Sequence, residues 1–235
     1  MEEHSDPEYN LFYSKPSPNC SHCSSIVRVI SKDNVSNIFH VFSNRVQPVI
    51  IQQGGHESIE LYSSLRRLHN KHGELIDDYF DEISGSAGYP DRFSKLFQQY
   101  PSSQVFATTF HWKTQRSSAV RLLAEVFPQP HFLPANSRDS PFKSLIMQSP
   151  LAPPHTLLWK TQLSNVWLVV GSGTLSLQFT AVPACRSVCS SFSVNVYSSD
   201  VVYFSKEFWT ATLKAIGNDT SISLMGSFSK RSMHR

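Results

Sequence analysis

Residues 192–228 read FSVNVYSSDVVYFSKEFWTATLKAIGNDTSISLMGSF, and this stretch decides the expected fold. Apolar and polar residues alternate along it in short runs, which is the pattern of half-buried β-strands. The runs are separated by Ser-Ser-Asp and Gly-Asn-Asp breaks that are typical of turns. We therefore predict consecutive antiparallel strands, with Asp200 as a turn residue.

The preceding residues extend this pattern toward the N-terminus. An apolar run at 166–170, the turn Gly171-Ser172-Gly173 and an alternating run ending at Phe179 predict a hairpin. Helical spacing predicts helices within 35–42, 57–70 and 117–127. Further strands are predicted at 24–30, 49–53, 75–84, 104–112 and 141–149. The expected fold is mainly β with some α, and its helices precede most of the strands.

Residues 199–210 resemble the last strands of a JmjC domain. This branch of the cupin superfamily consists mostly of Fe(II)- and 2-oxoglutarate-dependent oxygenases. In that family the segment reads roughly Gly-Asp, two apolar residues, Tyr/Phe-Phe-Pro and then Trp-Trp-His. The corresponding residues here begin with Ser199-Asp200, keep Tyr203-Phe204 and end with Phe208-Trp209-Thr210. The aromatic frame is kept, and Thr210 stands where the family has a metal-binding histidine.

The resemblance implies a cupin-like double-stranded β-helix, also called a jelly-roll barrel. A helix followed by Pro48-Val-Ile-Ile stands near the start, as in the family. We assign the JmjC-like domain to residues 26–230. Residues 1–25 are predicted to be an N-terminal tail and residues 231–235 a C-terminal tail.

The resemblance also gives the places of the other metal ligands. Oxygenases of this kind hold iron through two histidines and one carboxylate, and the first pair comes as His-x-Asp/Glu before the Gly turn. Counted back from Gly171, this motif falls on Leu158-Trp159-Lys160, or on His155-Thr156-Leu157 if the loop carries an insertion. Neither alignment supplies a carboxylate, and no Asp or Glu occurs between Asp139 and Asp200. The predicted degenerate metal positions are His155, Leu157, Leu158, Lys160 and Thr210.

Aromatic residues are predicted to line or fill the barrel where the metal is lost. A metal site rebuilt from His111 or His131 with Asp200 or Glu207 is an alternative. The candidate lining residues are Trp159, Trp167, Tyr203, Phe208 and Trp209.

The resulting hypothesis is a catalytically inactive JmjC-like domain that acts as a protein-interaction or scaffold module, with no cofactor. One alternative is an active protein hydroxylase or demethylase that uses Fe(II) and 2-oxoglutarate with non-standard ligands. A second alternative is a metal-free cupin that binds a small molecule. No nucleophile elbow or phosphate-binding glycine loop points to another enzyme class.

Four cysteines occur as two close pairs, Cys20-x-x-Cys23 and Cys185-x-x-x-Cys189. The favoured interpretation is four reduced thiols in an intracellular protein. A zinc site built from all four is an alternative, and disulfides within or between the pairs are another.

Composition limits the remaining classes. A net charge of +3 over 235 residues, without a long basic run, makes nucleic-acid binding unlikely. No apolar stretch is long enough to cross a bilayer, and the acidic start lacks the pattern of a secretory signal. We therefore predict a cytoplasmic protein with a protein partner and without membrane contact. The chain ends seven residues after Phe228, so a homodimer built on helices after the barrel is not expected.

Overall fold

A computed structural model describes residues 18–33, 46–53, 61–79, 82–84, 92–99, 109–127, 130, 133, 137–157 and 163–230. The strands are β1 (Ile30–Asp33), β2 (Val49–Gln52), β3 (Glu82–Ser84), β4 (Thr109–Thr114), β5 (Ser137–Gln148), β6 (His155–Thr156), β7 (Asn165–Ser172), β8 (Thr174–Ala181), β9 (Phe192–Val196), β10 (Val201–Ser205), β11 (Trp209–Ile216) and β12 (Ser221–Lys230). The helices are α2 (Leu61–Tyr79), α3 (Phe93–Gln99) and α4 (Ser117–Ala124), with short 3-10 turns η2 (Cys20–Cys23) and η3 (Pro183–Cys185).

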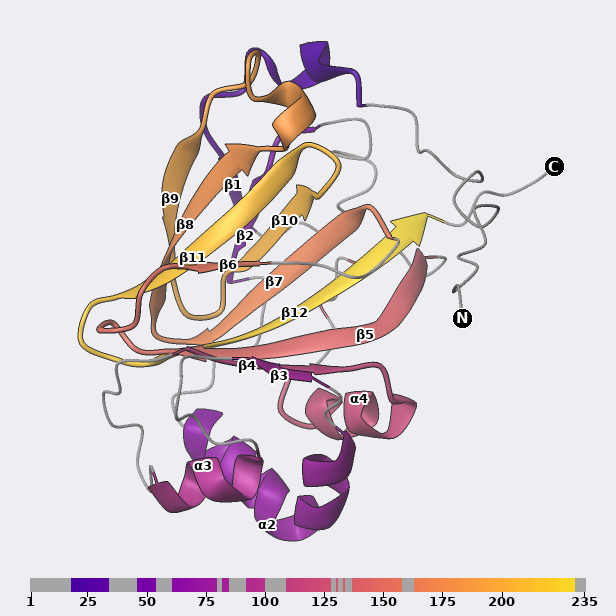
Figure 1. The fold of residues 1–235 in the computed structure, drawn as a ribbon, viewed down its shortest axis with the longest axis vertical. Coiled ribbons are helices and arrows are strands. Elements are labelled where there is room, and N and C mark those ends of the chain that lie inside the picture. The colour runs from indigo at the N-terminus through magenta and orange to yellow at the C-terminus, as the bar shows by residue number, and fades with distance from the viewer. Residues whose placement is uncertain are drawn as a thin grey trace, which may run out of the picture.

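Two β-sheets form the body of the domain, and the helices gather beside β3, β4 and β5 (Figure 1). The large sheet has the order β1-β2-β10-β7-β12-β5-β4-β3, and the small sheet has the order β6-β11-β8-β9. From β10 onward each strand lies in the sheet opposite to that of the preceding strand. This is the topology of a jelly-roll barrel. The predicted fold class, a mainly β cupin-like barrel with N-terminal helices, is confirmed.

The predicted hairpin at 166–179 is wrong in its pairing. β7 pairs with β10 and β12, whereas β8 pairs with β9 and β11. Gly173 has a φ of 74°, a left-handed conformation that glycine adopts without steric cost. Its turn therefore carries the chain from one sheet to the other. Local alternation cannot distinguish these cases, because a strand has the same period whichever neighbour it pairs with.

Several other expected elements differ in their bounds. Residues 75–79, predicted as strand, belong to α2, because the apolar face that begins with Leu61 and Leu65 continues to the buried Ile76. Only β3 remains of that strand. Of the predicted strand at 24–30, only Ile30 lies in a strand. The strands predicted at 49–53 and 141–149 correspond to β2 and β5. β4 overlaps the strand predicted at 104–112, and α4 lies within the helix predicted at 117–127. The helix predicted within 35–42 lies outside the described residues.

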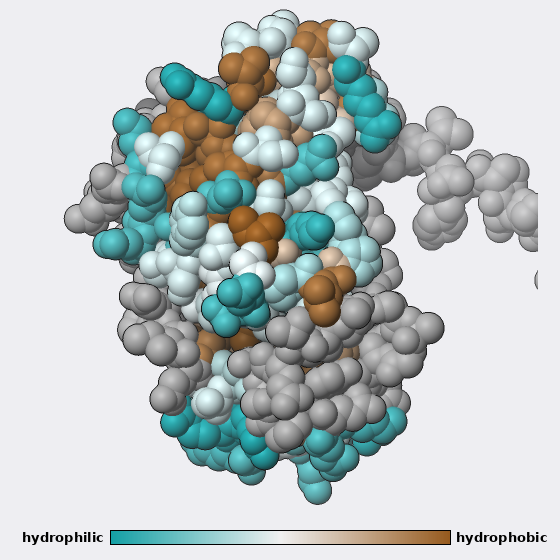
Figure 2. All heavy atoms as spheres, turned by 90° about the vertical axis from the view of Figure 1, so that its left-hand side faces the viewer, coloured by the Kyte–Doolittle hydropathy of each residue, from teal (hydrophilic) through white to brown (hydrophobic). Residues whose placement is uncertain are grey.

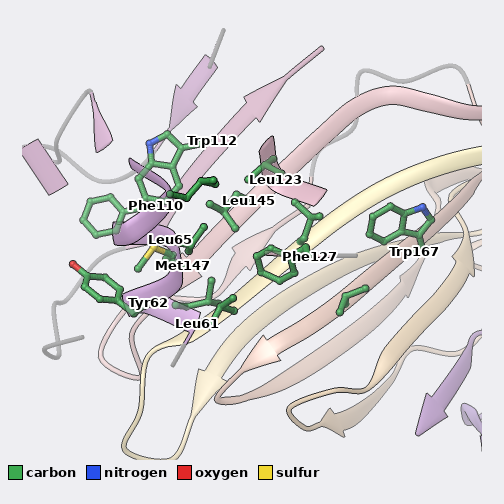
Figure 3. Close-up of a cluster of buried hydrophobic side chains, with 14 of the residues drawn as sticks. Leu61, Tyr62, Leu65, Phe110, Trp112, Leu123, Phe127, Leu145, Met147 and Trp167 are labelled. Carbon is green, nitrogen blue, oxygen red and sulfur yellow. The ribbon is translucent and has the colours of Figure 1, made fainter. Parts of the chain in front are cut away.

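One core lies between the large sheet and the helices (Figure 3). Leu61, Tyr62 and Leu65 of α2 pack there, and Leu123 of α4 joins them. Burying such large apolar side chains stabilises the fold by about 1.5–3 kcal/mol each. The large sheet contributes side chains from β4, β5 and β7 to this core (Figure 3), which are Phe110, Trp112, Leu145, Met147 and Trp167. Phe127, which follows α4, packs with them.

A second core fills the space between the two sheets. Val166, Leu168 and Val170 of β7 point into it, whereas the intervening Trp167 and Val169 belong to the helix-side core. β8 contributes Leu175, Leu177 and Phe179, and β11 contributes Trp209, Ala211, Leu213 and Ala215. The barrel interior is therefore largely apolar.

Two disulfides join the N-terminal segment to the loop between β8 and β9. Cys20 is bonded to Cys185 and Cys23 to Cys189, and the described chain has no free cysteine. The prediction of four reduced thiols is therefore wrong. The bonded cysteines are 165 and 166 residues apart in the sequence, and no local pattern predicts that such distant residues lie side by side in the fold. Residues 20–23, assigned to the tail, lie against the barrel, and Cys23 is fully buried in its core.

Candidate functional site

The start of β11 is the place where the family resemblance puts a metal-binding histidine. Burial alternates along β11: Trp209 and Ala211 are buried in the barrel core, and Thr210 between them is half-buried. Thr210 therefore lies on the outer face of the small sheet, because successive side chains of a strand point to opposite faces. The residue that points into the barrel at this end is Trp209, whose Nε1 donates to the Val46 carbonyl oxygen at 2.7 Å.

The other predicted metal positions do not meet Thr210. His155 of β6 lies opposite Leu213 of β11, three residues beyond Thr210. Leu157 is buried in the barrel core, and its backbone N–H donates to the Ala211 carbonyl at 2.9 Å. Leu158, Trp159 and Lys160 lie outside the described residues.

His155 instead meets His111, a residue of β4 that lies on the other sheet. His111 Nδ1 and His155 Nε2 are 3.0 Å apart, so one ring donates a hydrogen bond to the other. His111 is 1% exposed and lies opposite Ile146, a residue of the barrel core, so its ring points into the barrel. Lys113, 7% exposed, lies two residues further along β4 on the same face. Burial, and then the positive charge of Lys113, lower the pKa of His155 from its ordinary value of 6.5.

Further polar residues surround this histidine pair. Gln148 Nε2 donates to Thr109 Oγ1 and to the Pro153 carbonyl, both at 2.9 Å. Gln148 Oε1 accepts from the Ala215 backbone N–H at 2.6 Å, so this side chain joins the two sheets. The end of the barrel near β6 is therefore polar and carries the positive charge of Lys113, in contrast to its apolar middle.

The lowered pKa of His155 predicts an acid-sensitive fold. The neutral ring is favoured in the folded state, so this contribution to stability is present above about pH 6.5 and is lost as the pH falls toward the lower folded pKa. His155→Gln keeps a hydrogen-bonding group beside His111 but does not titrate there. We expect this variant to lose less stability than wild type between about pH 7 and pH 5, measured as the urea midpoint at each pH.

Thr156→Ser, at the exposed neighbouring residue of β6, provides the control for this measurement. This substitution changes no ionisable group and should leave the pH dependence of wild type unchanged. Parallel curves for wild type and His155→Gln would contradict the assignment of the acid sensitivity to the barrel histidine.

The remaining candidate residues lie elsewhere. Asp200 Oδ2 accepts from the Tyr197 N–H at 3.0 Å, which fits the predicted turn role. Its pKa is raised by burial, although hydrogen bonds from the Tyr197 and Gln53 backbone act in the opposite direction. Glu207 is hydrogen-bonded to Ser164. His131 lies outside the described residues.

Two of the five predicted lining residues do not face the barrel interior. Trp167 and Tyr203 belong to the core beneath the helices, because they alternate with the inward residues of β7 and β10. The Tyr203 hydroxyl donates to Asn165 Oδ1 at 2.9 Å, and burial raises the pKa of Tyr203 to about 12. Phe208 and Trp209 do lie in the barrel core, and Trp159 is outside the described residues.

The donor set does not fit iron. A facial site needs two imidazole nitrogens and a carboxylate around one point. Among the described residues, one cluster brings three potential metal ligands together. It consists of Cys23, Cys185 and Cys189, whose sulfur atoms lie within 4.8 Å of one another, and it contains neither an imidazole nor a carboxylate. The two barrel histidines have Lys113 beside them, and a positive charge disfavours a dication.

The cysteine cluster has the spacing of a zinc site but a different chemistry. Zinc binds thiolates, and all four sulfur atoms are joined in disulfides here. The zinc alternative therefore applies only to a reduced form of the protein.

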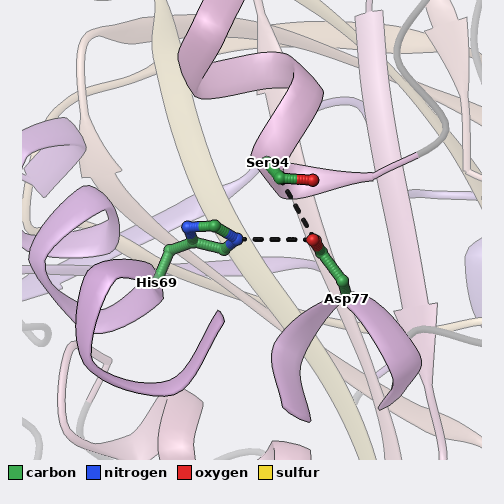
Figure 4. Close-up of polar contacts among 3 residues, drawn as sticks. All are labelled: His69, Asp77 and Ser94. Carbon is green, nitrogen blue, oxygen red and sulfur yellow. Dashed lines mark hydrogen bonds and ion pairs between the residues drawn. The ribbon is translucent and has the colours of Figure 1, made fainter. Parts of the chain in front are cut away.

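A polar groove of about 590 Å³ lies on the helical layer, and no pattern in the sequence indicated it. His69 Nε2 lies 3.5 Å from Asp77 Oδ2 on the same helix, and Asp77 Oδ1 accepts from the Ser94 backbone N–H at the start of α3 (Figure 4). α2 departs from helical geometry at His72, which lies between these residues. The contacts join the kinked α2 to α3, and we assign them a structural role.

None of the described helices is long and apolar enough to span a membrane.

Comparison with known proteins identifies the family. The sequence model of the C6orf89 C-terminal domain matches residues 20–223. The chain belongs to this family. The match begins at Cys20, which is bonded to Cys185, and extends through β11 to the first residues of β12. No curated protein sequence matches the chain.

Solved structures of a ribosomal oxygenase, YcfD from Escherichia coli, resemble this C6orf89-type domain at low identity. One matches with a TM-score of 0.44 and 13% identity over 80% of this chain and 49% of that chain. Another has a TM-score of 0.46 and 13% identity over 83% and 53%. The complex of YcfD with cobalt and 2-oxoglutarate has a TM-score of 0.43 and 14% identity over 80% and 49%. The chain spans about half the length of these proteins, and identities this low concern the fold alone.

Proposed function

We propose that this domain is a JmjC-like barrel without oxygenase chemistry that acts as a protein-interaction or scaffold module. The observation that supports it most is the packing at the start of β11, where the family resemblance places a metal ligand. There Trp209 fills the inward position, 1% exposed, and Thr210 faces outward. A metal ligand at this end of β11 would require a histidine or carboxylate in place of Trp209, because Trp209 is the residue that points into the barrel.

A second candidate function has its own support in the polar end of the barrel. Lys113 supplies a buried positive charge beside the hydrogen-bonding histidine pair, and such surfaces bind carboxylates. A metal-free barrel that binds a small carboxylate there is the alternative. An active protein hydroxylase or demethylase that uses Fe(II) and 2-oxoglutarate with non-standard ligands is the third hypothesis.

One titration experiment separates these functions. Purified, oxidised protein is titrated anaerobically with Fe(II), with 2-oxoglutarate, and with both, by calorimetry, and succinate is then assayed in air. The scaffold hypothesis predicts no saturable binding of either compound. Binding of 2-oxoglutarate without metal, abolished by Lys113→Met, supports the small-molecule barrel instead. Stoichiometric iron together with succinate formation would establish an oxygenase.

The disulfides bear on the expected location. Disulfides persist in oxidising compartments and are rare in the cytosol. We propose that the protein works in an oxidising compartment, such as the lumen of the secretory pathway, in place of the cytoplasm expected from the sequence.

A further inference from the structure

β9 has the features of a strand that pairs with another chain. It ends the small sheet, and among the described strands it pairs only with β8. The register with β8 is regular from Phe192 to Val196, without a bulge. No Asp, Glu, Lys, Arg or Pro occurs between Ser187 and Ser199. Natural edge strands are usually protected from pairing by charge, proline or a bulge, and β9 has none of these.

The other described edge strands differ from β9. β1, at the end of the large sheet, contains Lys32 and Asp33, and β3 at the opposite end contains Glu82. β6 is only two residues long. β9 is thus the longest uncharged edge in the described part of the chain.

The surface around β9 is partly apolar. Phe192 and Val194 belong to the periphery of the barrel core, but both are only half-buried. Val188, 47% exposed, and Tyr197, 57% exposed, flank β9 at its two ends. Figure 2 shows the face of the molecule that contains this edge, where hydrophobic residues gather in the upper half. Pairing at β9 would remove part of this apolar surface from water, which is favourable.

We propose that β9 pairs antiparallel with β9 of a second copy of the chain, about a two-fold axis at Val194. In this register Phe192 lies opposite Val196 of the second copy, and Ser193 lies opposite Asn195. Apolar residues face apolar residues on the barrel side, and polar residues face polar residues on the outer side. The strand is therefore complementary to itself, as an isologous interface requires. The two four-stranded sheets would join into one continuous sheet.

The test measures the association of the full chain by sedimentation velocity over a wide concentration range. Wild type is expected to form a reversible dimer. Ser193→Lys combined with Asn195→Lys places two pairs of lysines opposite each other across the two-fold axis, and should weaken the dimer about tenfold. Both side chains are exposed on the outer face, so the fold should be kept, as checked by circular dichroism.

Two matched experiments make the result specific. Ser176→Lys with Gln178→Lys adds the same charge on the same face of the neighbouring β8 and should leave the dimer intact. Mixing the double lysine variant with Ser193→Glu/Asn195→Glu should restore association as a heterodimer, because opposite charges then face each other. A wild-type monomer at every concentration, or a dimer unaffected by the β9 lysines, would overturn the proposal. The measurement uses neither iron nor 2-oxoglutarate, so its failure is separate from that of the proposed function.

Discussion

Removal of both disulfides is expected to lower the free energy of unfolding by about 7–8 kcal/mol, about 5 kcal/mol for the first long loop and about 2–3 kcal/mol for the second ring. Each bridge closes a loop of about 165 residues in the unfolded chain, and this lost entropy destabilises the unfolded state. The expected cost is a large share of the stability of a typical domain, which is about 5–15 kcal/mol. The variant Cys20→Ser/Cys23→Ala/Cys185→Ala/Cys189→Ala should therefore unfold at much lower urea concentration, or fail to fold.

The two bridges are expected to contribute about equally when removed singly, and each less than the first long loop. If Cys20–Cys185 remains, the Cys23–Cys189 bond closes only a short additional ring, so Cys23→Ala/Cys189→Ala should cost about 2–3 kcal/mol. The sum of the two single removals, about 4–6 kcal/mol, should then be smaller than the cost of removing both. Urea unfolding followed by far-ultraviolet circular dichroism measures each value. Equal stability of the oxidised and reduced wild-type protein would show that the bridges do not form.

Trp209→Ala is expected to lower the free energy of unfolding by about 3–5 kcal/mol, the range for large aromatic residues in a core. Trp209 is 1% exposed, and its ring packs edge-on against Phe192 at a centroid distance of 5.1 Å. The substitution also removes the hydrogen bond from Nε1 to the Val46 carbonyl. Trp209 lies at the barrel end nearest the disulfides. Because the two bridges restrain the chain there, we expect the strands to close only part of the cavity that the substitution leaves.

Trp209→Phe separates packing from hydrogen bonding. The phenyl ring keeps most of the packing, so the expected cost falls to about 1–2 kcal/mol, mostly from the lost hydrogen bond. Thr210→Ala, the adjacent residue on the outer face, is the control and should change stability by less than about 0.5 kcal/mol. A larger effect of Thr210→Ala than of Trp209→Ala would contradict the assignment of Trp209 as the inward residue.

The sequence indicated some residues of the candidate site but not their contacts. Counting from Gly171 gave His155 only with an insertion in the loop, and the absence of a carboxylate between Asp139 and Asp200 was visible in the sequence. The partner of His155 could not be found in this way. His111 lies 44 residues earlier, in a strand of the other sheet, and a lone histidine in TTFHW carries no local signal of that contact.

The orientation of aromatic residues was also beyond the sequence. Trp167 and Tyr203 alternate with inward residues, but both faces of the large sheet are buried, one by the barrel and one by the helices. Apolar residues on both faces give a continuous apolar run, so period-two alternation no longer identifies the inner side.

The sequence by itself determined the β-rich composition, the positions of most barrel strands and the lack of a carboxylate at the expected metal position, because these depend on local alternation and on residue identity. Only the tertiary structure decided that β7 and β8 lie in different sheets, that Trp209 and not Thr210 points into the barrel, and that Cys20 and Cys23 reach the β8–β9 loop. The physical reason is the same in each case. A strand carries its period in its own residues, but its pairing partner and the face that becomes the core are set by segments far away in the chain.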